Sequence, residues 1–281
     1  MPSGARAAAA ERVQVSARLV AAKTAATVGE PLSIGIALSI DPGWHIYWLH
    51  PGDAGIPTQV TWTAASGVRI DPVQWPAPRR FSELGGYEAI GYDGALLLPA
   101  SVVVTASASK VTLEGQVSWL ACKDDCVRGS APVKLTLAVG GKAEETPDAA
   151  RIALALSRVP RPLEASDPFN LKLESPPSAK PGETVPFTVT VGPKDVGTEV
   201  RLEAFFLQPP VSATVGREQR LSEQALRIDA SLPAEGAPSA GTRFADGVLQ
   251  VQLQHGGQTL SRFVLLSFPT VSAAIETGSP R

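Results

Sequence analysis

Two cysteines separated by three residues carry the strongest chemical signal in this sequence. Cys122 and Cys126 are the only cysteines among its 281 residues, and the polar run Lys123-Asp124-Asp125 lies between them. A strand pattern leads into Cys122, and the polar run is typical of a tight turn. Such a turn brings two Cα atoms within the roughly 7 Å that a disulfide requires. A disulfide between the two cysteines is therefore geometrically reasonable.

A purely structural disulfide is the first alternative to a redox-active one. Closing a loop of about five residues contributes only about 2 kcal/mol of chain entropy, against more than about 4 kcal/mol for a loop of about 100 residues. A domain of this size also buries a sufficient core without a cross-link. The small contribution to stability favours a redox role for Cys122 and Cys126 over a passive one.

Metal binding is the second alternative. Zinc usually takes four ligands, but beyond the two cysteines the sequence offers only His45 and His50, far away along the chain, and a third histidine, His255. Two thiolates would suit soft Cu(I), so a copper-binding role stays open. Our main prediction is that the chain holds neither a metal nor another cofactor.

The composition excludes several other classes of protein. Lys and Arg total 25 and Asp and Glu total 27, which gives a formal net charge of -2 and no basic surface for nucleic acid. No uncharged apolar run approaches the ~20 residues that span a bilayer. Hydrophobic residues make up 44% of the chain, enough for a substantial core in each half.

Short strands and turns dominate the elements that must position the cysteines. Glycine and proline occur 25 times each, and Leu32–Ile40 alternates apolar and other residues with the period of a half-buried strand. Further strands are predicted over Val13–Val20, Trp44–Trp48, Gln59–Thr63, Val68–Asp71, Leu96–Val104, Val111–Leu120, Pro132–Val139, Phe169–Leu173, Val185–Val191, Val200–Leu207, Leu226–Leu232, Val248–His255 and Leu260–Phe268. The pattern predicts an all-β protein with two immunoglobulin-like sandwiches.

The predicted domain organisation has two sandwiches joined by a linker. We expect a disordered tail at residues 1–10, a first sandwich over 11–140, a linker over 141–167, a second sandwich over 168–275 and a tail at 276–281. Asp148–Val159 has helical spacing, with Thr146 as its N-cap, so the linker should contain one short helix. The first ten residues lack the apolar core of a signal peptide. Their alanine run favours the remnant of an export signal over the alternative of a disordered cytosolic tail.

Several motifs in one order resemble a known family. They are Gly43–Trp48, Leu49–Gly55, Gln74–Pro78, Gly86–Gly94 and Val117–Cys126. Together they resemble the N-terminal periplasmic region of the DsbD/ScsB family of transmembrane thiol:disulfide reductases, in particular its ScsB-like branch, which is linked with copper tolerance. The resemblance covers residues 11–140, and the rest of the chain fits it by architecture alone.

The resemblance implies an electron-transfer role and a redox partner. Such proteins pass electrons from cytoplasmic thioredoxin through a membrane domain to a periplasmic thioredoxin-like domain. That domain reduces the N-terminal immunoglobulin-like domain, which then reduces disulfide-bearing periplasmic proteins. The family's redox pair maps onto Cys122 and Cys126, although we associate a wider spacing with the DsbD branch. The resemblance implies a protein-disulfide reductase module in the periplasm, as the N-terminal part of an inner-membrane protein.

The resemblance also implies a loop that shields the disulfide. Its counterpart is Leu84–Tyr92, within a segment, Phe81–Gly94, that is rich in glycine and aromatic residues and that we predict to be a long surface loop. Leu84, Tyr87 and Tyr92 would screen sulfur from water and small thiols. An ordinary mobile loop whose aromatic residues pack on the core is the alternative.

Three further residues are candidates for the surroundings of the disulfide. His45 and Tyr47 lie two positions apart on one predicted strand and therefore share a face, which the resemblance places beside the disulfide. His45 could transfer a proton to or from a thiolate near neutral pH, or it is a packing histidine. Trp119 would flank the cysteine hairpin.

Three functions therefore remain in competition. The favoured one is thiol–disulfide exchange in which Cys126 links to the partner and Cys122 resolves the mixed disulfide. The others are a non-catalytic protein-binding double sandwich with a structural disulfide, and a Cu(I)-binding periplasmic protein. The second sandwich would position the first or widen the surface for partners.

Overall fold

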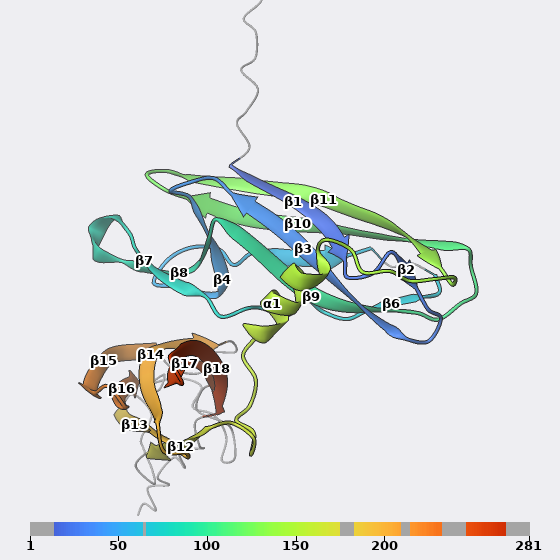
Figure 1. The fold of residues 1–281 in the computed structure, drawn as a ribbon. Coiled ribbons are helices and arrows are strands. Elements are labelled where there is room, and N and C mark those ends of the chain that lie inside the picture. Colours follow the sequence, from blue (N-terminus) through green and yellow to red (C-terminus); the bar gives the residue numbers. More distant parts are fainter. Residues whose placement is uncertain (1–13, 64–65, 175–182, 209–213, 232–245, 268–281) are drawn as a thin grey trace, which may run out of the picture. The chain divides into compact units, whose positions relative to one another are not determined.

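The computed structural model describes residues 14–63, 66–174, 183–208, 214–231 and 246–267. The chain divides into two compact units, Met1–Ser157 and Arg158–Arg281. Each unit contains two facing, mainly antiparallel sheets with a core between them (Figure 1). The prediction of an all-β chain with two sandwiches and one short helix is confirmed over the described residues.

The first unit is a sandwich of two sheets. Within the described residues, the smaller sheet has the order β1 (Val15–Ala21), β3 (Pro31–Ile40), β9 (Ala95–Val104), β6 (Val68–Ile70). The larger sheet has the order β2 (Ala25–Ala26), β11 (Cys126–Val139), β10 (Lys110–Cys122), β4 (His45–Gly52), β8 (Glu88–Asp93), β7 (Arg79–Ser82), and β5 (Gln59–Trp62) also pairs with β10. The larger sheet carries both cysteines, one at the end of β10 and one at the start of β11.

Alternating burial shows why these segments form strands. The predicted alternation in β3 is confirmed, because Leu32, Ile34, Ile36, Leu38 and Ile40 are all buried. The odd-numbered positions of β10 from 113 to 121 are likewise buried, so one face of this strand lies against the core. Cys122 lies at the opposite parity and therefore points out of the sandwich core.

Helix α1 (Ala149–Ser157) covers the outer face of the smaller sheet. Ile152 and Ala155 pack against Val20, Ala37 and Leu97. The predicted helix is therefore present. It is packed on the first unit, whereas the sequence had placed it in a linker between the two units.

The start of α1 is fixed by polar contacts. The Thr146 hydroxyl accepts the N–H of Asp148 at 3.2 Å, which is the capping role predicted for this threonine. The Asp148 carboxylate accepts hydrogen bonds from Arg18 on β1 at 2.9 and 3.0 Å and from Arg151 at 2.6 Å. The Arg18 hydrogen bond lowers the pKa of Asp148. The helix is thus tied to the sheet by a carboxylate that is stabilised in its charged form.

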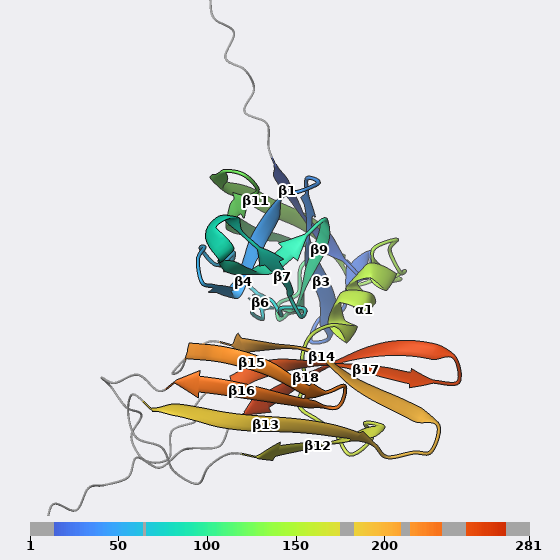
Figure 2. The same cartoon turned by 90° about the vertical axis from the view of Figure 1, so that its left-hand side faces the viewer.

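The second unit is a sandwich of the same general kind (Figure 2). One described sheet has the order β12 (Phe169–Glu174), β13 (Thr184–Pro193), β16 (Ala225–Ser231), β15 (Thr214–Ser222), and the other has the order β14 (Thr198–Gln208), β17 (Asp246–His255), β18 (Gln258–Ser267). Phe169, Phe187 and Phe205 are almost fully buried between these sheets.

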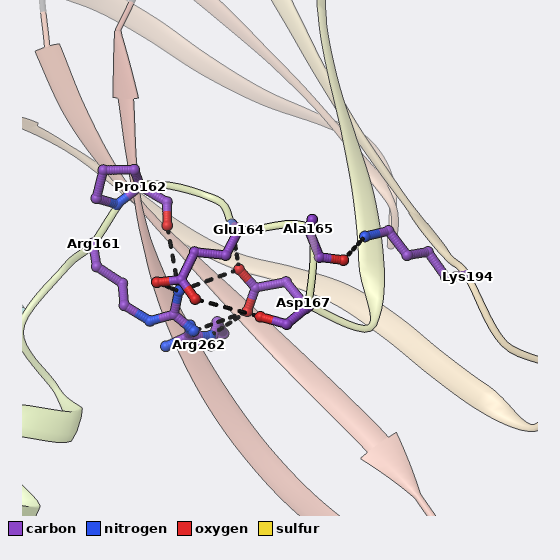
Figure 3. A network of polar contacts seen from close by, with 8 residues as sticks. Arg161, Pro162, Glu164, Ala165, Asp167, Lys194 and Arg262 are labelled. Carbon is purple, nitrogen blue, oxygen red and sulfur yellow. Dashed lines mark hydrogen bonds and ion pairs between the residues drawn. The ribbon is translucent and has the colours of Figure 1, made fainter.

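A buried carboxylate anchors the segment that leads into β12 (Figure 3). The Asp167 side chain is 3% exposed and accepts hydrogen bonds from Arg262 of β18 at 2.7 Å and from Arg161 at 3.1 Å. It also accepts the backbone N–H of Glu164 at 2.8 Å. Because a buried carboxylate is stable only when paired, this network fixes the entry of the chain into the second sandwich.

The acid sensitivity of the first unit should depend on Asp148. Its pKa is lowered in the folded state, so its contribution to stability is present above the unfolded pKa of about 3.9 and is lost as the pH falls through the folded value. Asp148→Asn should lower the melting temperature by about 1–4 °C at pH 7 and by progressively less below about pH 4. Circular dichroism melts between pH 2 and 7 measure this. A difference independent of pH would contradict it.

Candidate functional site

A disulfide closes the hairpin formed by β10 and β11. Cys122 and Cys126 lie directly opposite each other in the register, with a bonded sulfur pair and Cα atoms 4.1 Å apart. The turn between them, Lys123–Asp125, is exposed. The disulfide that the spacing made reasonable is therefore present, at the outer end of a hairpin.

The two cysteines differ strongly in exposure. Cys122 is 1% exposed, whereas Cys126 is an exposed residue and is followed by the exposed Val127. Cys122 packs with Tyr47 and Ala89. The site therefore offers one accessible cysteine and protects the other.

Pairing within the larger sheet explains which side chains cover Cys122. Cys122 lies opposite His45 of β4, and antiparallel partners that face each other project from the same side of a sheet. Tyr47, two positions along β4, shares that side. Phe81 of β7 packs against the same cluster. Strands β4 and β7 thus line the disulfide face with aromatic side chains, and β8 contributes Ala89.

Glu83 fastens the segment between β7 and β8 to this face. Its Oε1 atom lies 3.0 Å from His45 Nε2 and accepts the Tyr47 hydroxyl at 2.6 Å. The Phe81 ring stacks on the His45 ring, with centroids 4.8 Å apart and planes 13° apart. The loop that follows begins with a short 3-10 turn, Leu84–Gly86. Sequence reasoning gave Glu83 and Phe81 no role, although both lie within the predicted loop Phe81–Gly94.

Burial raises the pKa of Tyr47, and its hydrogen bond to the Glu83 carboxylate raises it further. The phenol therefore stays protonated throughout the physiological range and remains a hydrogen-bond donor. This donor is what the Glu83 carboxylate requires in a half-buried position. The polar contact thus persists without any change of charge on Tyr47.

The structure brings some predicted site residues together and separates others. His45 and Tyr47 lie on the disulfide face, as expected. Tyr92 pairs with Ile46 and is buried on the opposite face, where its hydroxyl donates to the Pro76 carbonyl at 2.7 Å. Trp119 is also on the core side, because its parity in β10 is opposite to that of Cys122.

The remaining two predicted shielding residues lie on the segment between β7 and β8. Tyr87 is 57% exposed. The side chain of Leu84 lies outside what the structure describes. The prediction of one long loop over Phe81–Gly94 is wrong, since β7, the 3-10 turn and β8 form a hairpin there. Main-chain pairing overrides the weak strand propensity of the glycines in this segment.

The described part of the chain contains no cluster of side chains that could form a metal site. There, no group of three or more His, Cys, Asp or Glu side chains is placed to hold an ion. His50 accepts the backbone N–H of Gly52 through Nδ1 at 3.2 Å. No helix in the described ranges is long and apolar enough to cross a membrane.

The part of the chain that contains the disulfide matches a known protein family. Residues 16–138 match the family described as "Thiol:disulfide interchange protein DsbD, N-terminal". The match covers most of the first unit and none of the second. The matched range contains Cys122, Cys126 and the cluster of His45, Tyr47 and Glu83. The match and the cysteine pair support a thiol–disulfide exchange domain in the first unit.

A solved structure resembles the fold of this chain beyond residues 16–138. The crystal structure of the N-terminal periplasmic domain of ScsB from Proteus mirabilis is 19% identical, with a TM-score of 0.58 over 91% of this chain and 92% of that one. At this identity the match shows a shared fold. The YadV chaperone is 10% identical over 88% of this chain and 99% of that one, but its TM-score of 0.20 supports no argument. A search of curated proteins found no significant match.

The contacts of Glu83 should limit access of small thiols to the disulfide. Glu83→Ala removes the hydrogen bonds to His45 and Tyr47, so dithiothreitol should reduce the disulfide about three- to tenfold faster than in the wild type. Glu88→Ala is the matched control, because it removes the Arg80 ion pair on the exposed side of the same hairpin. Equal rates for wild type and Glu83→Ala would contradict a latching role.

Proposed function

We propose that this chain is an electron-relay module that reduces disulfide-bearing periplasmic proteins through Cys122 and Cys126. A thioredoxin-like domain of the same membrane reductase would reduce the pair again after each turnover. The observation that carries the proposal is the contrast between an exposed Cys126 and a Cys122 that is 1% exposed within one disulfide. A disulfide that only stabilised the fold would not require one accessible sulfur.

The contrast in exposure supports different steps for the two cysteines. In the reduced protein, the Cys126 thiolate attacks a partner's disulfide, and a mixed disulfide forms as one partner sulfur leaves and takes up a proton. The Cys122 thiolate then attacks the Cys126 sulfur, restores the internal disulfide and releases the second partner thiol. Two electrons pass from the dithiol to the partner, and regeneration takes two from a thioredoxin-like dithiol.

The surroundings of the pair suit these steps. Lys123 and Arg128 are exposed near Cys126, where positive charge favours the thiolate, while Asp124 and Asp125 oppose it. Cys122 is covered by Tyr47 and Ala89, so water and small thiols reach it poorly. A partner bound at the hairpin end would meet Cys126 first.

The compartment and the partner class rest on the family. The ScsB structure is of a periplasmic domain, and a disulfide that cycles between oxidised and reduced forms suits an oxidising compartment supplied with electrons from outside it. Periplasmic location, thioredoxin-fold or other disulfide-bearing partners and attachment to a membrane reductase are therefore parts of the same proposal.

Single-cysteine variants test the assignment of the steps. Reduced Cys122→Ala should form a stable mixed disulfide through Cys126 with an oxidised thioredoxin-fold protein, since no resolving thiol remains. Reduced Cys126→Ala should form it at least about tenfold more slowly, because Cys122 is covered. Non-reducing electrophoresis and mass spectrometry of the trapped species measure both rates.

Two results would contradict the proposal at different levels. Faster trapping through Cys122 than through Cys126 would reverse the assignment of the cysteines. Absence of a mixed disulfide in both variants would remove the exchange function itself.

A further inference from the structure

One edge of the larger sheet is open beside the accessible cysteine. Strand β11 pairs with β10 along its whole length, but on its other side β2 reaches only Ala138 and Val139. Strand β1 of the facing sheet contacts β11 without pairing with it. Among the described residues, no strand pairs with the outer edge of β11 from Cys126 to Leu137.

The register shows which main-chain groups face this edge. The Cα atoms of Cys122 and Cys126 are 4.1 Å apart, the short spacing of a pair that does not exchange hydrogen bonds. In such a pair the N–H and C=O groups of both residues point away from the partner strand. The groups of Cys126 therefore point to the open edge, and so do those of Arg128 and Ser130, which lie at the same parity.

Pro132 agrees with this register. It lies at the same parity, opposite Gln116, so the N–H that proline lacks would have pointed to the open edge. Proline and lysine on an edge strand prevent pairing with other chains. Pro132 and Lys134 protect the far part of β11 in this way. Cys126–Ala131 contains neither residue, so the part of the edge without proline or lysine begins at the exposed Cys126.

We propose that the edge of β11 over Cys126–Ala131 is the docking surface for an extended, cysteine-containing segment of the partner protein. The segment would add a strand to the larger sheet, with hydrogen bonds to the outward groups of Cys126, Arg128 and Ser130. This pairing places a partner sulfur beside the Cys126 sulfur. The inference rests on the proposed exchange function and specifies how that site selects polypeptide disulfides.

Ser130→Pro is the variant that isolates this edge. It removes one outward N–H, and the β10 ladder should keep its hydrogen bonds because Pro132 already occupies the same parity. Gly129 precedes it in extended strand conformation, which proline tolerates. Ser130→Ala is the matched control, since it removes the hydroxyl and keeps the N–H.

The test compares three disulfides as oxidants of the reduced protein. The first is a seven-residue peptide, rich in valine and threonine, whose central cysteine carries a 2-hydroxyethyl disulfide. The second is the same peptide with N-methyl groups on alternate amides. It is made in two versions, so that each edge of the peptide strand is blocked in one of them. The third is bis(2-hydroxyethyl) disulfide, which has no main chain to pair. The wild-type protein should react about three- to tenfold faster with the plain peptide than with the N-methylated peptide whose pairing edge is blocked. This difference corresponds to the loss of one main-chain hydrogen bond. Ser130→Ala should keep this preference and Ser130→Pro should lose it.

Each other outcome overturns a defined part of the account. Equal rates for wild type with the plain and the methylated peptides would overturn the docking surface and leave exchange intact, and this comparison does not depend on any variant folding. A preference that survives in Ser130→Pro would overturn the assignment to β11. Failure of the reduced protein to react with all three disulfides would overturn the exchange function and the docking surface with it.

Discussion

The chain reverses direction between Cys122 and Cys126, and the disulfide between them joins a buried sulfur to an exposed residue. This position follows from the parity of β10, which buries alternate residues up to Ala121 and turns Cys122 to the outer face of the sandwich. The following strand then starts with Cys126 at an edge of the sheet. The covalent bond, its protection on one side and its accessibility on the other therefore all depend on the register of one hairpin.

Protection on the buried side comes from three neighbouring strands. Tyr47 and His45 of β4 lie beside Cys122, and Glu83 contacts both side chains from the segment after β7. The Tyr47 phenol is neutral at physiological pH, and burial raises its pKa further, so the carboxylate retains a donor. Each such hydrogen bond contributes about 0.5–1.5 kcal/mol. We therefore expect the Glu83 contacts to slow small thiols and to open when a partner binds.

Much of this arrangement could be predicted from the sequence, and the failures have identifiable causes. The buried face of the strand at Leu32–Ile40 and the Cys122–Cys126 disulfide follow from local sequence patterns, and both are present in the structure. The family resemblance places Tyr92 in the shielding loop, but strand parity turns its side chain into the core. The glycine-rich pattern predicts a loop in place of the β7–β8 hairpin, and a loop has no strand parity from which to assign side-chain direction. Glu83 was missed because its partners are 36 and 38 residues away in the chain.

The reduction potential of the Cys122–Cys126 pair tests the central claim most directly. Equilibration of the wild-type protein against glutathione or dithiothreitol buffers, with thiol labelling and mass spectrometry, gives this value. A pair that relays electrons between thioredoxin-fold proteins should have a potential between about -270 and -180 mV. A potential below about -300 mV would mark a structural disulfide and contradict the account.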